Sequence, residues 1–209
     1  GMGWFDAVTH TFATMGTGGF YTKNASVGAF ANPGAEWLIS GFMLLASINF
    51  ALYYEMVKGD WKSLFRDSEL RLFLAIVAIA VLVITMDIGH LFASVFEAFR
   101  YAVFQVTSII STTGFVTDDY QRWPELSKGI IFLLAFIGAC AGSTGGGIKV
   151  IRVLILFKYI RRTLYHLIHP QAVIPLRVAG KAISEDTVQK VLGFIVVYLV
   201  VFVAISLVL

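Results

Sequence analysis

The chain has 209 residues, of which 58% are hydrophobic and 14% are charged, and its formal net charge is +3. Soluble domains carry about 25% charged residues, and one with this composition would expose large apolar patches. The small net charge excludes nucleic acid as a natural partner, and the single cysteine, Cys140, excludes an internal disulfide framework. The composition therefore predicts an integral membrane protein whose first partner is the lipid bilayer.

Six apolar stretches follow one another along the chain, and four of them resemble membrane spans. A helix needs about 20 mostly apolar residues to cross the bilayer core. The predicted spans are residues 37–54, 72–91, 129–148 and 191–209. The other two stretches, residues 7–22 and 101–117, end in Thr, Gly and Phe rather than in Leu or Val.

The two ends of the sequence also carry information. Residues 1–4 lack the basic region and cleavage site of a signal peptide. The chain opens within an apolar motif and closes within an apolar run, which predicts a fragment of a longer polypeptide.

The placement of basic residues predicts the topology. Lys and Arg gather in residues 58–71 and 158–190, which we expect in the cytoplasm, whereas residues 118–125 are mainly acidic and should lie outside. Residues 101–117 must then begin and end outside, so they enter the membrane and return. Such a segment is tolerated only where protein or a water-filled cavity satisfies its backbone, which points toward a pore.

The two Thr/Gly stretches are related by a shift of 95 residues. The shift places Thr17-Gly18-Gly19-Phe20 on Thr112-Thr113-Gly114-Phe115. Each unit reads as a short pore helix, a Thr/Gly loop and a spanning helix, and repetition at a fixed period predicts several such units around one axis.

The chemistry of the Thr/Gly loops suits a dehydrated cation. Rings of backbone carbonyls replace the water shell of K⁺ in ion filters. Glycine allows backbone conformations that turn successive carbonyls toward an axis, and threonine adds a hydroxyl. The C-terminal end of each pore helix carries partial negative charge, which favours a cation. The residues alone leave a non-conducting re-entrant packing element open as the alternative.

A glycine cluster at residues 141–147 interrupts the apolar stretch that begins near Gly129. Each of three consecutive glycines costs about 1 kcal/mol relative to alanine in a helix interior, so the helix should break there. A phosphate-binding loop is excluded because no Ser or Thr follows Lys149. A kink or small-residue helix interface is the structural alternative to a functional loop.

Three motifs resemble the TrkH/TrkG/KtrB family of K⁺ transporters: residues 15–20 (MGTGGF), 111–115 (STTGF) and 138–152 (GACAGSTGGGIKVIR). The resemblance covers essentially the whole chain. It implies an all-α membrane protein of helix–pore loop–helix repeats in pseudo-fourfold array, incomplete here. Residues 1–58 would supply the pore helix, filter and last helix of repeat two, residues 59–168 repeat three, and residues 169–209 a cytoplasmic linker and the first helix of repeat four.

The resemblance also implies the site residues and partners. The filter residues would be Thr17, Gly18, Gly19, Thr112, Thr113 and Gly114, with K⁺ as the transported ion and no other metal or covalent cofactor. The intramembrane gate loop would be Gly142, Ser143, Thr144, Gly145, Gly146 and Gly147. The first filter has Gly18 where the second filter has Thr113, so the first filter carries one hydroxyl fewer. The resemblance further implies a homodimer in the bacterial inner membrane and a cytosolic, nucleotide-binding regulatory subunit of the TrkA type.

Other polar residues in the apolar stretches are predicted to be structural. These are His10, Asp87, His90, Glu97 and Arg100. Lys149 and Arg152 would anchor the cytoplasmic vestibule, touch a regulator or simply snorkel. No enzymatic constellation occurs in the sequence, so the leading hypothesis is gated K⁺ uptake. The rivals are a cation-coupled secondary transporter (H⁺ or Na⁺ symport) and a non-conducting fragment. Symport is disfavoured because no ionisable residue flanks either Thr/Gly loop in the sequence.

Overall fold

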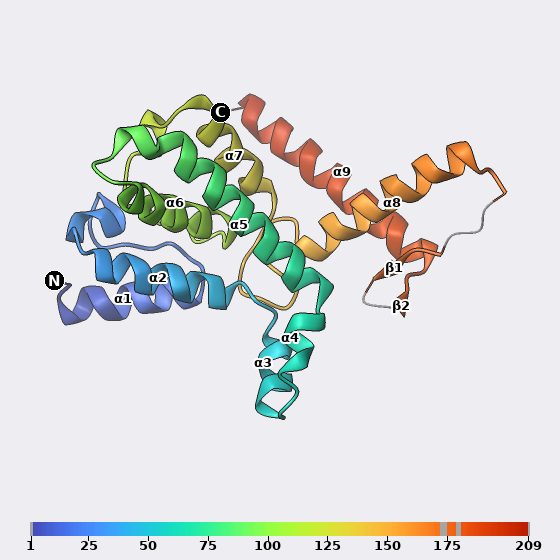
Figure 1. Cartoon of the computed structure of the whole chain (residues 1–209), viewed down its shortest axis with the longest axis horizontal. Coiled ribbons are helices and arrows are strands. Elements are labelled where there is room, and N and C mark those ends of the chain that lie inside the picture. The colour runs from blue at the N-terminus through green and yellow to red at the C-terminus, as the bar shows by residue number, and fades with distance from the viewer. Residues whose placement is uncertain (1, 172–174, 179–180, 209) are drawn as a thin grey trace.

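The structure is a computed structural model that describes residues 2–171, 175–178 and 181–208 (Figure 1). Residue 1 and parts of the predicted unit 169–209, namely 172–174, 179–180 and 209, lie outside the described residues. Helices dominate, which agrees with the predicted all-α class, and a two-stranded antiparallel hairpin pairs Arg177 with Ala182. The helices and strands are α1 (Trp4–Met15), η1 (Ser26–Phe30), α2 (Pro33–Ala46), α3 (Phe50–Val57), α4 (Lys62–Arg66), α5 (Ser68–Ile88), η2 (Gly89–Leu91), α6 (Val95–Ile110), η3 (Tyr120–Arg122), α7 (Glu125–Phe136), α8 (Val150–Ile168), β1 (Arg177–Val178), β2 (Lys181–Ala182) and α9 (Glu185–Val208).

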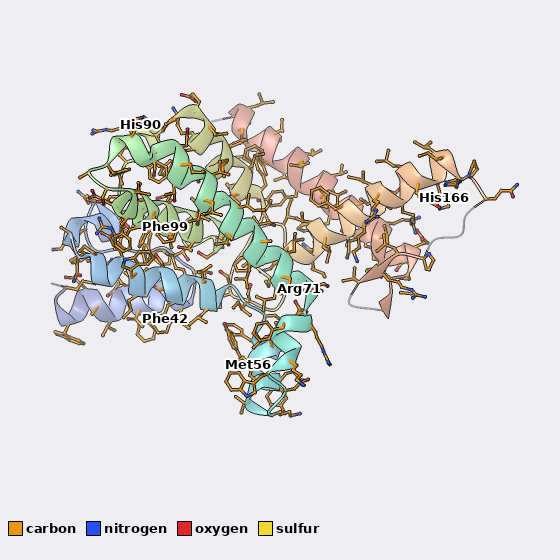
Figure 2. The ribbon with its side chains drawn as sticks, viewed as in Figure 1. Phe42, Met56, Arg71, His90, Phe99 and His166 are labelled. Atoms are coloured by element: carbon orange, nitrogen blue, oxygen red, sulfur yellow. The ribbon has the colours of Figure 1, made fainter. Side chains whose placement is uncertain are left out.

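Two helical segments have the length and composition of membrane spans, as predicted. They cover Ser68–Leu91 and Glu185–Val208, with 24 residues each. At 1.5 Å per residue each is about 36 Å long, enough for a hydrocarbon core of about 30 Å. Figure 2 places Arg71 and His90 at opposite ends of α5.

The predicted span over residues 37–54 is broken, so its description as one continuous helix is wrong. α2 and α3 meet at a bend of 90°. The Ser47 hydroxyl donates to the Met43 carbonyl oxygen at 2.8 Å, and the Asn49 side-chain oxygen accepts from the Ala51 amide at 2.9 Å. Ser47 thus closes one helix and Asn49 caps the next. Figure 2 shows the resulting α3–α4 hairpin, which carries Met56, projecting from the rest of the molecule.

The predicted helix from Gly129 breaks earlier than its glycine cluster. α7 ends at Phe136, because Ile137 adopts an extended backbone and Gly138 donates its amide to the Ile148 carbonyl oxygen at 2.8 Å. The chain becomes helical again only at Val150, where α8 begins. Tertiary backbone pairing therefore ends this helix before its glycines do.

The core forms around α6, which packs against α2, α5 and α7. Its buried residues include Ala98, Ala102, Val106 and Ile110, which recur every four positions and so line one face. The 16 residues of α6 measure about 24 Å, too short to cross the bilayer. A buried helix that is too short to cross the bilayer is the arrangement predicted for a re-entrant pore helix.

The C-terminal end of α5 supports the start of α7. The Asp87 carboxylate accepts hydrogen bonds from the Ser127 amide at 3.1 Å and from the Ser127 hydroxyl at 2.6 Å. Negative charge at a helix N-terminus is favourable, so Asp87 has a structural contact of the kind predicted.

Candidate cation filter and glycine loop

The two pore helices end in the same hydrogen-bond pattern, which reproduces the sequence repeat at atomic detail. Gly18 donates its amide to the Ala13 carbonyl oxygen at 2.9 Å, and Thr113 donates to that of Ser108 at 3.0 Å. The Thr17 amide donates to the carbonyl oxygen of Thr14, three residues earlier, at 3.2 Å. The Thr112 amide donates in the same way to that of Ile109, at 3.0 Å. All these pairs are related by the 95-residue shift, so the two loops share one backbone design.

The backbone of both loops alternates in handedness. Thr17 and Gly19 have φ values of 49° and 66°, and Thr112 and Gly114 have values of 61° and 83°. The residue between each pair has no positive φ. A left-handed conformation costs a non-glycine residue about 1–2 kcal/mol, so its recurrence at two threonines is a specific feature of these loops. Because residues of alternating handedness rotate successive peptide planes in opposite directions, consecutive carbonyl groups can face the same side of the loop.

The structure brings the two loops into contact. A Cβ atom added to Gly19 would overlap the Thr113 carbonyl oxygen, so this position requires glycine for space as well as for its φ. Further along, Gly28 donates its amide to the Val116 carbonyl oxygen at 3.1 Å, and the Val116 amide donates to the Ser26 hydroxyl at 3.2 Å. The two predicted filter loops therefore lie directly against each other.

Polar contacts between the second loop and its own pore helix, α6, stabilise the loop. The Ser108 hydroxyl donates to the Phe115 carbonyl oxygen at 2.6 Å, and the Ser111 and Thr113 hydroxyls lie 2.7 Å apart. Ser108, Ser111 and Phe115 are fully buried. These contacts fix the loop's shape, and neither Ser108 nor Ser111 was singled out from the sequence as part of the site.

His10 lies beside the second filter, which the sequence did not reveal. Its ring stacks on Phe115, with centroids 5.5 Å apart, although the two residues are 105 positions apart in the chain. The Nδ1 atom donates to the Asp6 carbonyl oxygen at 2.7 Å, because a carbonyl can only accept. Nε2 is buried without a hydrogen-bond partner among the described residues. The prediction of a packed, hydrogen-bonded histidine agrees with this geometry, but an ionisable group does adjoin a filter loop.

In the glycine loop, residues 137–149, two extended backbone segments, here called its legs, cross at close range. Ile137 and Ile148 form an isolated parallel bridge, and the Val150 amide donates to the Ala139 carbonyl oxygen at 3.3 Å. A Cβ atom on Gly138 would overlap the Gly146 carbonyl oxygen. Gly142 and Gly147 adopt positive φ values of 71° and 67°. The glycines therefore allow two backbone legs to approach within contact distance.

The tip of this loop touches the second filter. The Gly146 amide donates to the Thr112 hydroxyl oxygen at 2.7 Å. A Cβ atom on Gly145 would lie 2.9 Å from the Ser111 carbonyl oxygen. Lys149 donates from Nζ to the Gly145 carbonyl oxygen, which further folds the loop on itself. The six predicted gate residues thus include two that reach the filter, and the loop occupies the space next to Thr112.

The break between α2 and α3 docks onto the other side of the same loop. The Ser47 carbonyl oxygen accepts from the Cys140 amide at 3.0 Å, and the Phe50 amide donates to the Gly142 carbonyl oxygen at 3.0 Å. The Thr144 hydroxyl donates to the Ala46 carbonyl oxygen at 3.2 Å. Backbone groups that a broken helix would leave unpaired are therefore satisfied by the glycine loop, and the loop is held in return.

A cluster of three charged residues and a separate cation–π contact join neighbouring helices. Arg100 of α6 forms ion pairs with Glu36 of α2, with Nε and Oε2 3.3 Å apart, and with Glu97. This agrees with the structural role predicted for Glu97 and Arg100 and adds Glu36, which the sequence did not indicate. Arg152 places its guanidinium 3.8 Å from the ring centroid of Phe194 on α9.

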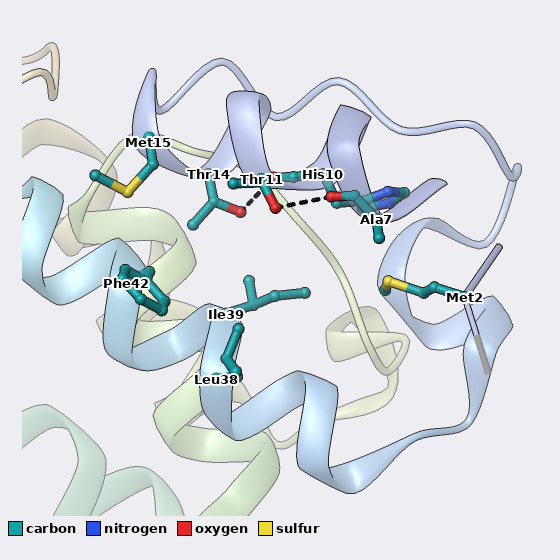
Figure 3. A pocket seen from close by; sticks show the side chains of 9 residues that line it. All are labelled: Met2, Ala7, His10, Thr11, Thr14, Met15, Leu38, Ile39 and Phe42. Atoms are coloured by element: carbon teal, nitrogen blue, oxygen red, sulfur yellow. Dashed lines mark hydrogen bonds between the residues drawn. The ribbon is translucent and has the colours of Figure 1, made fainter. Parts of the chain in front are cut away.

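A pocket of about 240 Å³ lies between α1 and α2 (Figure 3). Its threonine hydroxyls are already satisfied within α1, because Thr11 donates to the Ala7 carbonyl oxygen and Thr14 to that of His10. The remaining lining is mainly apolar and includes Leu38, Ile39 and Phe42. The pocket borders the filter region, because its lining includes His10, which stacks on Phe115, and it otherwise offers little polar chemistry.

The described residues contain no cluster of three or more His, Cys, Asp or Glu side chains that could hold a metal ion. The cation chemistry available at the site is that of backbone carbonyls and threonine hydroxyls. Repeated re-entrant helices that end in such loops, beside apolar spans, define a membrane protein of the pore-loop repeat class.

The chain belongs to the TrkH family, because a family model described as "TrkH: Cation transport protein" matches residues 2–209. The predicted family and fold class are confirmed. Among curated relatives, the Trk system potassium uptake protein TrkH of Escherichia coli K12 is 39% identical over 206 residues, and TrkG of the same organism is 36% identical over 200. The alignments cover 97% and 95% of this chain but 43% and 41% of the relatives, so the chain spans less than half of their length.

A solved structure has the same fold. The crystal structure of the potassium transporter TrkH from Vibrio parahaemolyticus superposes with a TM-score of 0.92 at 38% identity. The superposition covers 98% of this chain and 45% of that one. The arrangement of loops described above is therefore that of a known transporter fold.

Proposed function

We propose that the chain is part of a K⁺ uptake subunit and that ions pass along the two Thr/Gly loops. The observation that carries this proposal is the alternating backbone at Thr17–Gly19, repeated at Thr112–Gly114 with the same hydrogen bonds. Such a backbone offers consecutive carbonyl oxygens to a dehydrated cation. The names of the relatives as potassium uptake proteins support K⁺ as the ion. No enzymatic activity is proposed.

We propose that residues 142–147 act as a gate on the cytoplasmic side of the filter. The contact between the Gly146 amide and Thr112 supports this role, because it holds the backbone of the loop directly against a predicted filter residue. Residues 142–147 carry no large apolar side chain, and hydrogen bonds to Ala46, Phe50 and Thr112 hold them in place. Such a segment can move at lower cost than a core helix.

The wider assembly is also a proposal. Residues 1–58, 59–168 and 169–209 would belong to repeats two, three and four of a pseudo-fourfold pore in the bacterial inner membrane. The subunit would form a homodimer and bind a cytosolic nucleotide-binding subunit of the TrkA type. The basic segment from Lys158 to Lys190 is the proposed docking surface, and Arg162 there pairs with Glu185, with Nη2 and Oε2 2.9 Å apart.

Growth rescue tests the central proposal. The protein, expressed from its own complete gene, should restore growth of a K⁺-uptake-deficient bacterium at low K⁺. Gly114→Ser should abolish rescue, since its φ of 83° disfavours any side chain. Gly41→Ser should retain rescue, because no described residue lies within 4 Å of a Cβ atom added at Gly41. Failure of the unmodified protein to rescue, despite normal membrane insertion, would contradict K⁺ uptake. Rescue that disappears when the proton gradient alone is collapsed would favour symport.

A further inference from the structure

One buried carboxylate joins both ends of the glycine loop. Glu69 lies in the first turn of α5 and is 6% exposed. Its Oε1 atom accepts a hydrogen bond from the Ala141 amide at 2.7 Å and another from the Ile151 amide at 2.9 Å. Ala141 lies just before the predicted gate residues and Ile151 just after the loop returns to helix. A single oxygen from a third element therefore closes the loop.

The contact with Ile151 also serves the start of α8. The first amides of a helix have no partner within the helix, and Lys149 at the N-cap provides no side-chain cap. Glu69 supplies the missing acceptor from α5, and its negative charge suits the positive end of the α8 dipole. Hydrogen bonds to a charged acceptor are stronger than those between neutral groups. The loop and the N-terminus of α8 are thus tied to the same atom.

We infer that Glu69 is a positioning residue that holds the glycine loop beneath the filter and couples it to α8. The Gly146 amide bonds to Thr112 at the tip of the loop. This hydrogen bond persists only while the two ends of the loop keep their positions. A displacement of α8 would pull on the Glu69 carboxylate and, through it, on Ala141. Release of the loop therefore requires that at least one of the two bonds to Oε1 be broken. The consequence for ion flow rests on the proposed function, whereas the positioning role does not.

Cys140 provides a reporter that is independent of transport. It precedes Ala141 in the loop, and its side chain is 1% exposed. A thiol this buried reacts only when its surroundings open, so its rate of modification measures how often the loop leaves its place. N-ethylmaleimide modification of the purified protein, quantified by mass spectrometry of the peptide that contains Cys140, gives that rate.

The variants separate positioning from general stability. Glu69→Ala removes both bonds, and Glu69→Asp shortens the side chain so that one oxygen cannot reach both amides. Glu69→Gln keeps an oxygen acceptor at the same distance. Asp67→Ala is the matched control, because Asp67 lies at the same end of α5 but its Oδ1 accepts from the Leu70 amide of its own helix, at 2.6 Å.

We expect Glu69→Ala and Glu69→Asp to raise the Cys140 modification rate at least about tenfold, equivalent to about 1.4 kcal/mol in the opening equilibrium. Glu69→Gln should stay within about threefold of the unmodified protein, and Asp67→Ala within about twofold. An unchanged rate in Glu69→Ala, or an equal rise in Asp67→Ala, would overturn the inference. If Glu69→Ala does not yield folded protein, Glu69→Asp decides by the same criterion.

Ion flux in the same variants distinguishes the two proposals. If the loop is a gate, Rb⁺ leak through proteoliposomes should rise in Glu69→Ala in parallel with the Cys140 rate. A raised Cys140 rate with no flux in any variant, including the unmodified protein, would leave the positioning role standing and would contradict conduction.

Discussion

The crossing of the glycine loop predicts a large effect for Gly138→Ala. The added Cβ atom would overlap the Gly146 carbonyl oxygen and lie 2.9 Å from the Gly146 carbonyl carbon and 3.1 Å from that of Gly147. These neighbours are backbone, so no side chain can turn aside to make room. The two legs of the loop must separate instead.

Separation of the legs breaks at least two hydrogen bonds. These are the Gly138 amide to the Ile148 carbonyl oxygen, at 2.8 Å, and the Ile148 amide to that of Phe136, at 3.2 Å. Each bond contributes about 1 kcal/mol net, and leaving its buried groups unpaired adds to the loss. We therefore expect Gly138→Ala to destabilise the protein by about 2–4 kcal/mol, which lowers the melting temperature by about 6–12 °C.

Thermal unfolding of the purified protein in detergent measures this change. The matched control is Gly129→Ala, because Gly129 lies in α7, the helix that leads into the loop, and no described residue lies within 4 Å of a Cβ atom added there. Alanine should stabilise the helix there by about 1 kcal/mol, so the two glycine-to-alanine changes should have opposite signs. A Gly138→Ala protein that melts at the temperature of the unmodified protein would refute the close crossing of the legs.

Other predictions concern the filter and its supports. Gly19→Ala should lower the melting temperature of the purified protein more than Gly114→Ala does, because a Cβ atom at Gly19 also overlaps the Thr113 carbonyl oxygen, whereas at Gly114 only the positive φ opposes a side chain; equal melting temperatures of the two would contradict the loop contact at Gly19. Asp87→Ala leaves the Ser127 amide and hydroxyl without their acceptor and should lower the free energy of unfolding by about 1–3 kcal/mol in a denaturant titration. Arg100→Ala leaves a buried carboxylate on α2 unpaired and should cost about 3 kcal/mol by the same measurement, and a loss below about 1 kcal/mol would show that this ion pair is dispensable.

Local sequence determines several parts of this protein. The apolar runs of α5 and α9 are long enough to require helices in a bilayer, whatever surrounds them. The repeated Thr/Gly pattern marks both loops, because few residues other than glycine adopt positive φ values without cost. Family membership also follows from the motifs, since they are long enough to be specific.

Other features depend on contacts between distant segments. The bend between α2 and α3 and the early end of α7 arise where backbone groups pair across the fold, as in the bond from the Cys140 amide to the Ser47 carbonyl oxygen. His10 meets Phe115, and Glu69 meets both ends of the glycine loop, at separations of 72–105 residues. No local pattern predicts such partners, because they depend on how the helices pack.

The sequence by itself thus determined the membrane class, the pore-loop repeat and the positions of the glycines, since each follows from the hydropathy or conformational freedom of neighbouring residues. Only the tertiary structure decided what those glycines approach and which charged groups hold them. The physical reason is that a buried amide must find an acceptor somewhere, and the acceptor nearest in space to Ala141 lies 72 residues away in the chain.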